Sequence, residues 1–132
     1  MPTTSVVLAA VAAGGALGAS ARYLLGRALE LQGGHFFSLP AGTLLANALG
    51  CFAAGIMMGW VSSRTIPSEL LVAFLMTGVL GGFTTFSAFS FETLRLAQGG
   101  LWLSAALNVA ANLIVSLVGV VLGWHLIQAL SR

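Results

Sequence analysis

The sequence predicts an all-α membrane protein, and two features of its composition carry that prediction. Only 6% of its 132 residues are charged and 58% are hydrophobic, whereas soluble domains contain roughly 25% charged residues. The mean hydropathy of the chain is +1.02. A water-soluble surface cannot be built from so few charges, so most apolar side chains must face lipid. The arginines are scattered rather than clustered, which argues against a nucleic-acid partner.

Four apolar stretches are long enough to cross a bilayer, whose hydrocarbon core requires about 20 residues of helix. Between them lie segments rich in Gly, Pro and polar residues, which are typical of loops. We therefore expect a single domain over residues 1–132 with four transmembrane helices. The expected helices run from Ser5 to Leu29, from Leu39 to Val61, from Leu70 to Leu96 and from Leu101 to Leu130.

The first span carries charges only toward its end, where Arg22, Arg27 and Glu30 lie. The residues before it lack the basic stretch of a cleaved signal peptide, so we expect Met1 onward to belong to the mature chain. Small multidrug-type proton antiporters also have four short helices and dual topology. Their chemistry needs an ionisable carboxylate in the middle of the first span, and this span has none. That class is therefore an alternative rather than the favoured interpretation.

The second span places Thr43, Asn47 and Cys51 at intervals of four residues, which puts them on one helix face. Asn47 should lie at membrane depth, where an amide without a hydrogen-bond partner costs several kcal/mol. Cys51 is the only cysteine, so no intrachain disulfide forms and we expect it to behave as a small hydrophobic residue.

The third span contains the decamer GGFTTFSAFS, from Gly81 to Ser90. Two adjacent glycines weaken a helix, and the hydroxyls offer the backbone alternative partners. We expect two half-helices joined by an unwound turn in the middle of the membrane. Such a turn is tolerated only where it is buried in protein or lines a cavity. The carbonyls freed there suit a sodium ion, and the N-terminus of the second half-helix favours an anion.

Phe86 and Phe89 should lie on one face of the second half-helix, because they are three residues apart. A phenyl ring has a negative face and a positive edge, so two ring edges offer a weak site for a dehydrated anion. Ordinary core packing is the alternative interpretation of the pair. Their position beside Ser87 and Ser90, within reach of polar residues on other spans, favours the anion site.

In the fourth span Asn108, Asn112 and Ser116 recur at intervals of four and line one face. Polar residues of this kind serve either as hydrogen-bonding contacts between helices or as the wall of a water-filled or ion-filled track. An asparagine cannot satisfy all of its donor and acceptor sites on its own helix. Three polar residues on one stripe therefore favour the track.

The arginines are nearly balanced between the two ends of the expected bundle. With four spans, Arg64 and Arg132 share one side with the termini, while Arg27 and Arg95, together with Arg22, share the other. The positive-inside rule then gives almost no bias. Such a chain can insert in both orientations; the alternative is that the small imbalance fixes one.

The decamer, together with the segment from Gly42 to Asn47 (GTLLAN) and with Arg22, resembles the Fluc (CrcB) family of fluoride channels over the whole chain. The resemblance implies a channel in the inner (plasma) membrane that exports fluoride and so relieves fluoride toxicity. It implies an antiparallel dual-topology homodimer with two fluoride pores. A structural sodium ion would lie at the centre of the dimer, and no organic cofactor is implied.

The resemblance also assigns residues. It gives the sodium ion backbone oxygens of Gly81 and Thr84. Val120 stands where the polar track of the family ends in a hydroxyl, so the track here ends one turn earlier. Possible pore or vestibule residues are Arg22, Thr43 and Glu92; the carboxylate of Glu92 has either a direct transport role or a structural one. The fluoride pore is assigned to Asn47, Phe86, Ser87, Phe89, Asn108, Asn112 and Ser116.

The same residues admit two further interpretations besides the channel. A membrane assembly subunit that transports nothing would use the polar stripes only for packing. An enzyme is least expected, because the sequence contains no aspartate and no HExxH, GxSxG or CxxC spacing.

Overall fold

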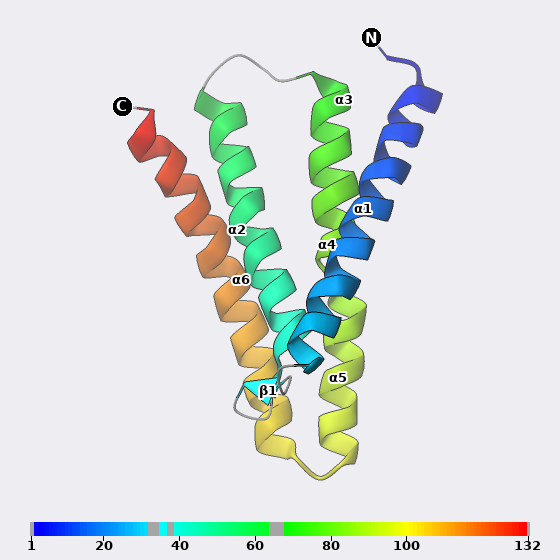
Figure 1. The fold of residues 1–132 in the computed structure, drawn as a ribbon. Coiled ribbons are helices and arrows are strands. Elements are labelled where there is room, and N and C mark those ends of the chain that lie inside the picture. Colours follow the sequence, from blue (N-terminus) through cyan, green and yellow to red (C-terminus); the bar gives the residue numbers. More distant parts are fainter. Residues whose placement is uncertain (1, 32–34, 37–38, 64–67, 132) are drawn as a thin grey trace.

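The computed structural model describes residues 2–31, 35–36, 39–63 and 68–131, and these form an all-helical protein with one small pair of strands (Figure 1). Four long helical segments run roughly along one direction. The third segment is composite, made of α3, the π-helical η1, α4 and α5. The elements in chain order are α1 (Thr4–Leu31), β1 (His35–Phe36), β2 (Leu39–Pro40), α2 (Ala41–Ser63), α3 (Glu69–Val72), η1 (Ala73–Leu80), α4 (Gly81–Phe83), α5 (Phe86–Gln98) and α6 (Trp102–Leu130).

Within the described residues, four helical segments are long and apolar enough to cross a membrane, as the sequence predicts. Their outer surfaces are apolar: Trp102, Leu103 and Leu117, all on α6, are 71%, 73% and 68% exposed. In a water-soluble protein such residues would form the core. Their exposure over the length of a helix fits a surface in contact with lipid.

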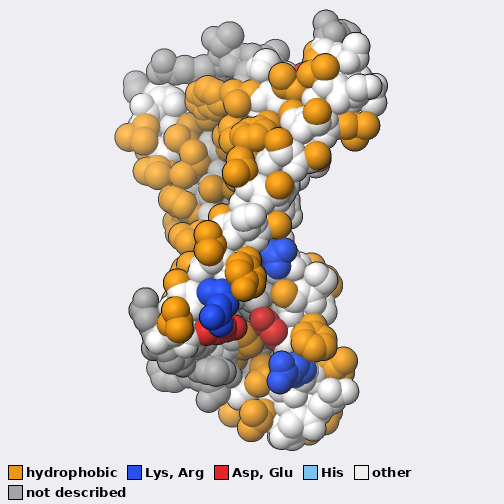
Figure 2. All heavy atoms as spheres, turned by 45° about the vertical axis from the view of Figure 1, so that its right-hand side comes forward, with side chains coloured by type: hydrophobic (Ala, Val, Ile, Leu, Met, Phe, Trp, Pro, Cys, Tyr) orange, Lys and Arg blue, Asp and Glu red, His pale blue; other side chains and the backbone are white. Residues whose placement is uncertain are grey.

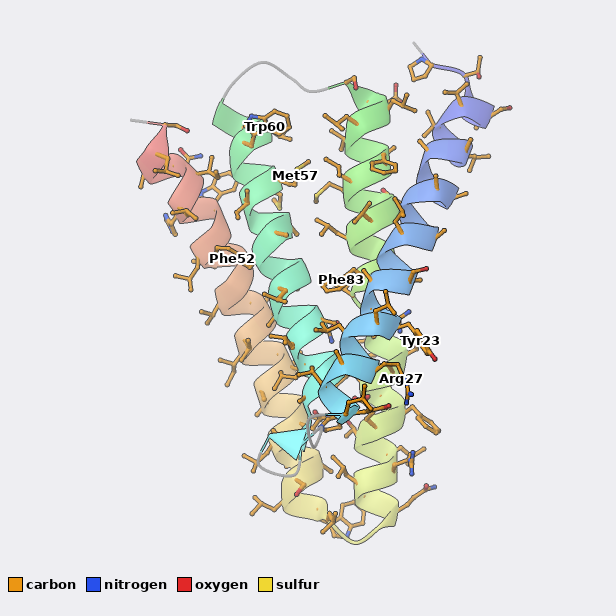
Figure 3. All side chains as sticks on the ribbon, in the orientation of Figure 1. Tyr23, Arg27, Phe52, Met57, Trp60 and Phe83 are labelled. Carbon is orange, nitrogen blue, oxygen red and sulfur yellow. The ribbon has the colours of Figure 1, made fainter. Side chains whose placement is uncertain are left out.

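The segments pack as two pairs, α2 against α6 and α1 against η1 and α4. Both pairs rely on glycine. A Cβ added at Gly18 of α1 would collide with backbone atoms of Val79 and Phe83, and one at Gly123 of α6 would collide with the backbone of Phe52. Figure 1 shows the pairs separating toward the end that holds both termini. In Figure 3, Met57 projects from α2 toward the third segment.

The start of the second span differs from the prediction. The sequence predicts a helix from Leu39, whereas Leu39–Pro40 is extended and pairs antiparallel with His35–Phe36, and α2 begins at Ala41. The physical reason is Pro40, because the residue before a proline is driven out of the helical region by the proline ring.

The third segment departs from α-helical geometry twice. Residues 73–80 form a π-helix, in which the turns are wider than in an α-helix. Thr84 and Thr85 then separate α4 from α5, since both are extended, with φ and ψ of −83° and 155° and of −153° and 121°. This extended pair lies within the decamer in which the sequence predicts an interruption.

Candidate functional site: a pocket beside the extended threonines

The extended pair is held by a side chain of α2. The Thr85 N–H donates to Asn47 Oδ1 at 2.8 Å, and Asn47 Nδ2 donates back to the Thr85 carbonyl at 3.2 Å. The amide therefore pairs with both polar groups of one residue, as a neighbouring strand would. Gly50, less than one helical turn further along α2, makes room for the Thr84 methyl group, because a Cβ there would collide with it.

Thr85 also starts the next helix. Its hydroxyl accepts a hydrogen bond from the Ala88 N–H at 3.2 Å and so caps the N-terminus of α5. The same hydroxyl lies 3.1 Å from the Ser87 hydroxyl. The first turn of α5 thus presents backbone N–H groups and the positive end of a helix dipole next to the extended pair.

A chain of side-chain hydrogen bonds leads away from Asn47 into the bundle. Asn47 Nδ2 donates to Asn112 Oδ1 at 3.0 Å, and Asn112 Nδ2 donates to the Asn108 Oδ1 and backbone carbonyl, both at 3.1 Å. Asn108 Nδ2 donates to the Thr93 hydroxyl at 2.9 Å, which donates to the Phe89 carbonyl at 2.8 Å. Asn108 is 0% exposed and Asn112 5%. The sequence analysis did not identify Thr93 as a functional residue. The only sequence feature that points to it is its spacing of four from Phe89, which places the two residues on one helix face.

A pocket of about 290 Å³ opens beside the extended pair. Five of the seven residues that the sequence assigns to the pore line it. Ser87 and Asn108 do not, and Asn108 is instead enclosed between helices. The walls come from α2, the extended pair, α5 and α6, and they comprise Asn47, Thr84, Thr85, Phe86, Phe89, Asn112, Leu113, Ser116 and Leu117.

The two phenylalanines lie together at this pocket but differ in burial. Their ring centroids are 5.2 Å apart and the ring planes are inclined by 59°. Phe89 is 7% exposed and packs within the chain, whereas Phe86 is 75% exposed. An aromatic ring left this open has room for a further surface to pack against it.

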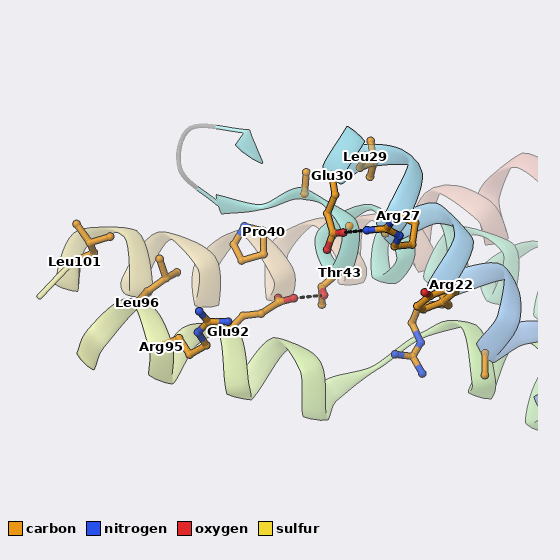
Figure 4. A pocket seen from close by; sticks show the side chains of 15 residues that line it. Arg22, Arg27, Leu29, Glu30, Pro40, Thr43, Glu92, Arg95, Leu96 and Leu101 are labelled. Atoms are coloured by element: carbon orange, nitrogen blue, oxygen red, sulfur yellow. Dashed lines mark hydrogen bonds and ion pairs between the residues drawn. The ribbon is translucent and has the colours of Figure 1, made fainter. Parts of the chain in front are cut away.

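A second, larger pocket of about 830 Å³ contains the three residues predicted as possible pore or vestibule groups, namely Arg22, Thr43 and Glu92 (Figure 4). The Thr43 hydroxyl donates to Glu92 Oε1 at 2.6 Å, while Glu92 Oε2 is buried without a hydrogen-bond partner among the described residues. Arg27 and Arg95 also line the wall. Figure 2 shows most of the visible charged side chains in the lower half of the view.

The extended pair removes the usual helical donors from backbone carbonyls before and within it. The Thr85 N–H, which would bond the Gly81 carbonyl in an α-helix, goes to Asn47. The Ala88 N–H, which would bond the Thr84 carbonyl, goes to the Thr85 hydroxyl. The intervening Gly82 carbonyl accepts from Arg22 Nε at 3.2 Å. The carbonyls of Gly81 and Thr84, which have lost these donors, are the two that the resemblance assigns to sodium, and carbonyl oxygens are suitable ligands for such a hard cation.

Comparison with known proteins gives a consistent result over most of the chain. Residues 9–124 match the family described as CrcB-like protein, Camphor Resistance (CrcB). A protein of Helicobacter acinonychis (strain Sheeba) named fluoride-specific ion channel FluC is 41% identical over 87% of this chain and 90% of its own length. A protein of the same name from Roseobacter denitrificans is 46% identical over 86% of this chain and 88% of its own length.

Proposed function

The chain belongs to the CrcB-like protein family, as the resemblance predicts, and from this premise we propose that it is a fluoride-selective channel. With four helical segments suited to crossing a membrane, it is a multi-pass membrane protein. Its role in this proposal is to export fluoride across the inner (plasma) membrane and so relieve fluoride toxicity.

One observation carries the proposal furthest: the pocket at the extended threonines collects polar and aromatic groups from three spans. Phe86 and Phe89 of α5 line it together with Ser116 of α6. Ring edges and a hydroxyl donor suit an anion that has lost its water. They carry only partial positive charges, so they attract the anion without holding it as tightly as a cationic side chain would. In this proposal the extended pair lies at mid-membrane depth, where its backbone borders the pore instead of lipid.

We further propose that a structural sodium ion binds the backbone oxygens of Gly81 and Thr84. Their lack of helical donors supports the fit. When bound, the ion supplies a positive charge that neutralises carbonyl dipoles at the discontinuity. Two carbonyls make an incomplete shell, so a second copy related by a two-fold axis would supply two more.

The sodium proposal is tested by exhaustive dialysis of purified protein against sodium-free buffer. We expect the sodium content to fall and the dimer to dissociate or lose fluoride transport, with recovery when sodium is restored. Potassium at equal ionic strength is the control. A dimer that keeps its assembly and transport without sodium would contradict the site.

The proposed assembly is an antiparallel homodimer with one pore on each side. Two features support it. The arginines are nearly balanced between the two ends, and the ring of Phe86 is largely exposed, so a second copy could cover it. An inverted copy would bring its own third segment against this one, so that both pores are bordered by both subunits.

The deciding experiment is anion efflux from liposomes that contain the purified protein. We expect rapid fluoride loss with little chloride loss, and no flux from protein-free liposomes. Fluxes that need a proton gradient and carry organic cations would favour the antiporter. No flux of any kind would favour an assembly subunit. One observation supports that alternative: the side chains of Asn47, Asn112 and Asn108 hydrogen-bond to one another, as polar residues that only hold helices together would.

A further inference from the structure

We propose that Asn108 and Thr93 act as positioning residues, which orient Asn112 and Asn47 and through them the N-terminus of α5, without contacting the permeating ion. This inference rests on the proposed function of the pocket. It changes the role of Asn108, which the sequence assigns to an ion track.

The asparagines are linked to one another and to the extended pair through their side-chain amides. A side-chain amide has two N–H groups. Asn47 uses them on the Thr85 carbonyl and on Asn112 Oδ1. Asn112 uses both on Asn108, at its Oδ1 and its backbone carbonyl. The amides of Asn47 and Asn112 are therefore held by neighbouring groups at the pocket wall that both residues line.

The hydrogen bonds also share one direction. Starting at the Thr85 N–H, each group donates to the next through Asn47, Asn112, Asn108 and the Thr93 hydroxyl, and the chain ends at the Phe89 carbonyl. Bonds aligned head to tail polarise and strengthen one another. We call these four side chains the amide relay.

The hydrogen bonds of the relay begin at Thr85 and end at Phe89, both at the N-terminus of α5. Thr85 caps α5 and Phe89 lies one turn later, so the relay clamps the turn that carries Phe86. Its last two members, Asn108 and Thr93, are absent from the pocket wall, and Asn108 is completely enclosed. They touch no ion in the pocket and influence it only by fixing the two phenylalanines relative to the extended pair.

Thr93 offers the sharpest test because two substitutions separate shape from hydrogen bonding. Thr93→Val keeps the shape and removes the acceptor for Asn108, whereas Thr93→Ser keeps the hydroxyl. In liposomes we expect Thr93→Val to lower the ratio of fluoride to chloride flux by roughly tenfold, the order of effect of one buried hydrogen bond. Thr93→Ser should restore the wild-type ratio. Ser131→Ala, which removes a hydroxyl that donates to the Ile127 carbonyl at the end of α6, serves as a control.

Hydrogen exchange provides a readout independent of transport. The Thr85 amide hydrogen should exchange faster in Thr93→Val than in the wild type, and Thr93→Ser should exchange as the wild type does. Where Thr93→Val fails to assemble, Asn108→Asp replaces it, since it keeps the acceptor for Asn112 and removes the donor to Thr93.

The outcomes separate the relay from the channel. If the wild type conducts fluoride and Thr93→Val matches it in flux ratio and in Thr85 exchange, the relay is wrong and the channel stands. A changed ratio with unchanged exchange would also overturn the relay. If the wild type conducts no fluoride, the proposed function fails, and the exchange rates alone decide whether the relay orders the extended pair.

Discussion

At the side chain of Asn47, one amide takes over the hydrogen bonding that a regular helix would provide. Its oxygen and nitrogen meet the N–H and the carbonyl of Thr85, which would otherwise be unsatisfied in a low-dielectric environment. Helical periodicity predicts that Asn47, Asn108 and Asn112 lie on inward faces. It cannot predict that they bond to one another, because that depends on how α2 and α6 are set against each other along their axes.

The unequal burial of the two phenylalanines predicts separable effects. Phe86→Ile should leave the fold intact because the ring is 75% exposed, whereas Phe89→Ile, at a side chain only 7% exposed, should cost about 1 kcal/mol or more. Both should lower fluoride flux, since each removes a positive ring edge from the pocket. Flux assays and thermal unfolding of the purified dimer measure the two effects. Wild-type fluoride flux in both variants would show that these rings do not line the pore.

Asn47→Asp should be more damaging than either. A carboxylate retains an acceptor for the Thr85 N–H but loses both donors, so it faces the Thr85 carbonyl and Asn112 Oδ1 with like partial charges. It also places a negative charge beside an anion path. We expect loss of fluoride transport together with a reduced yield of folded protein, measured by size-exclusion chromatography and efflux. A stable, fully conducting variant would contradict the placement of Asn47.

Among the elements, the third segment shows where sequence reasoning reached its limit. Two glycines and a run of hydroxyls indicate an interruption within residues 81–90, because these residues weaken a helix. That the interruption falls on Thr84 and Thr85 depends on a partner from α2. The π-helix η1 carries no comparable signal, because its sequence AFLMTGVL resembles that of an ordinary apolar helix apart from Thr77 and Gly78.

The contact between α1 and the third segment predicts a contrast between two neighbouring glycines. A Cβ at Gly18 would meet backbone atoms of Val79 and Phe83 that cannot turn aside, while a Cβ at Gly15 meets nothing within 4 Å. Gly18→Ala should destabilise the protein by roughly 1–3 kcal/mol. Gly15→Ala should be neutral or slightly stabilising, since alanine is the better helix former. Thermal unfolding in detergent measures both, and equal stabilities would contradict this packing.

Across the whole molecule, the described arginines lie in one region. Arg22, Arg27 and Arg95 line one pocket, and Figure 3 shows Arg27 in the half of the molecule away from the termini. Arg64 and Arg132, which the sequence assigns to the other end, lie outside the described residues. Composition predicts the number of spans well because lipid imposes one length on every helix. It says little about orientation, which rests on a difference of about one arginine.

Adding three lysines after Leu130 should therefore force one orientation, with the termini in the cytoplasm. Transport by such a variant alone should fall, because no oppositely oriented copy remains to form an antiparallel dimer. Coexpression with a copy biased the other way, by lysines at the opposite end, should restore it. Reporter fusions at the C-terminus measure orientation, and fluoride resistance of cells measures transport. Full resistance from one fixed orientation would refute the antiparallel arrangement.

The pairing of Asn47 with the backbone of Thr85 has a consequence for the evolution of the two positions. Asn47 contacts the N–H and carbonyl, which nearly every residue possesses. The contact should therefore leave no covariation between positions 47 and 85 in related sequences, although coupled changes normally mark such proximity. Position 47 should retain its amide, while position 85 should vary freely among residues that cap a helix. Relatives in which the two positions change in concert would contradict this expectation.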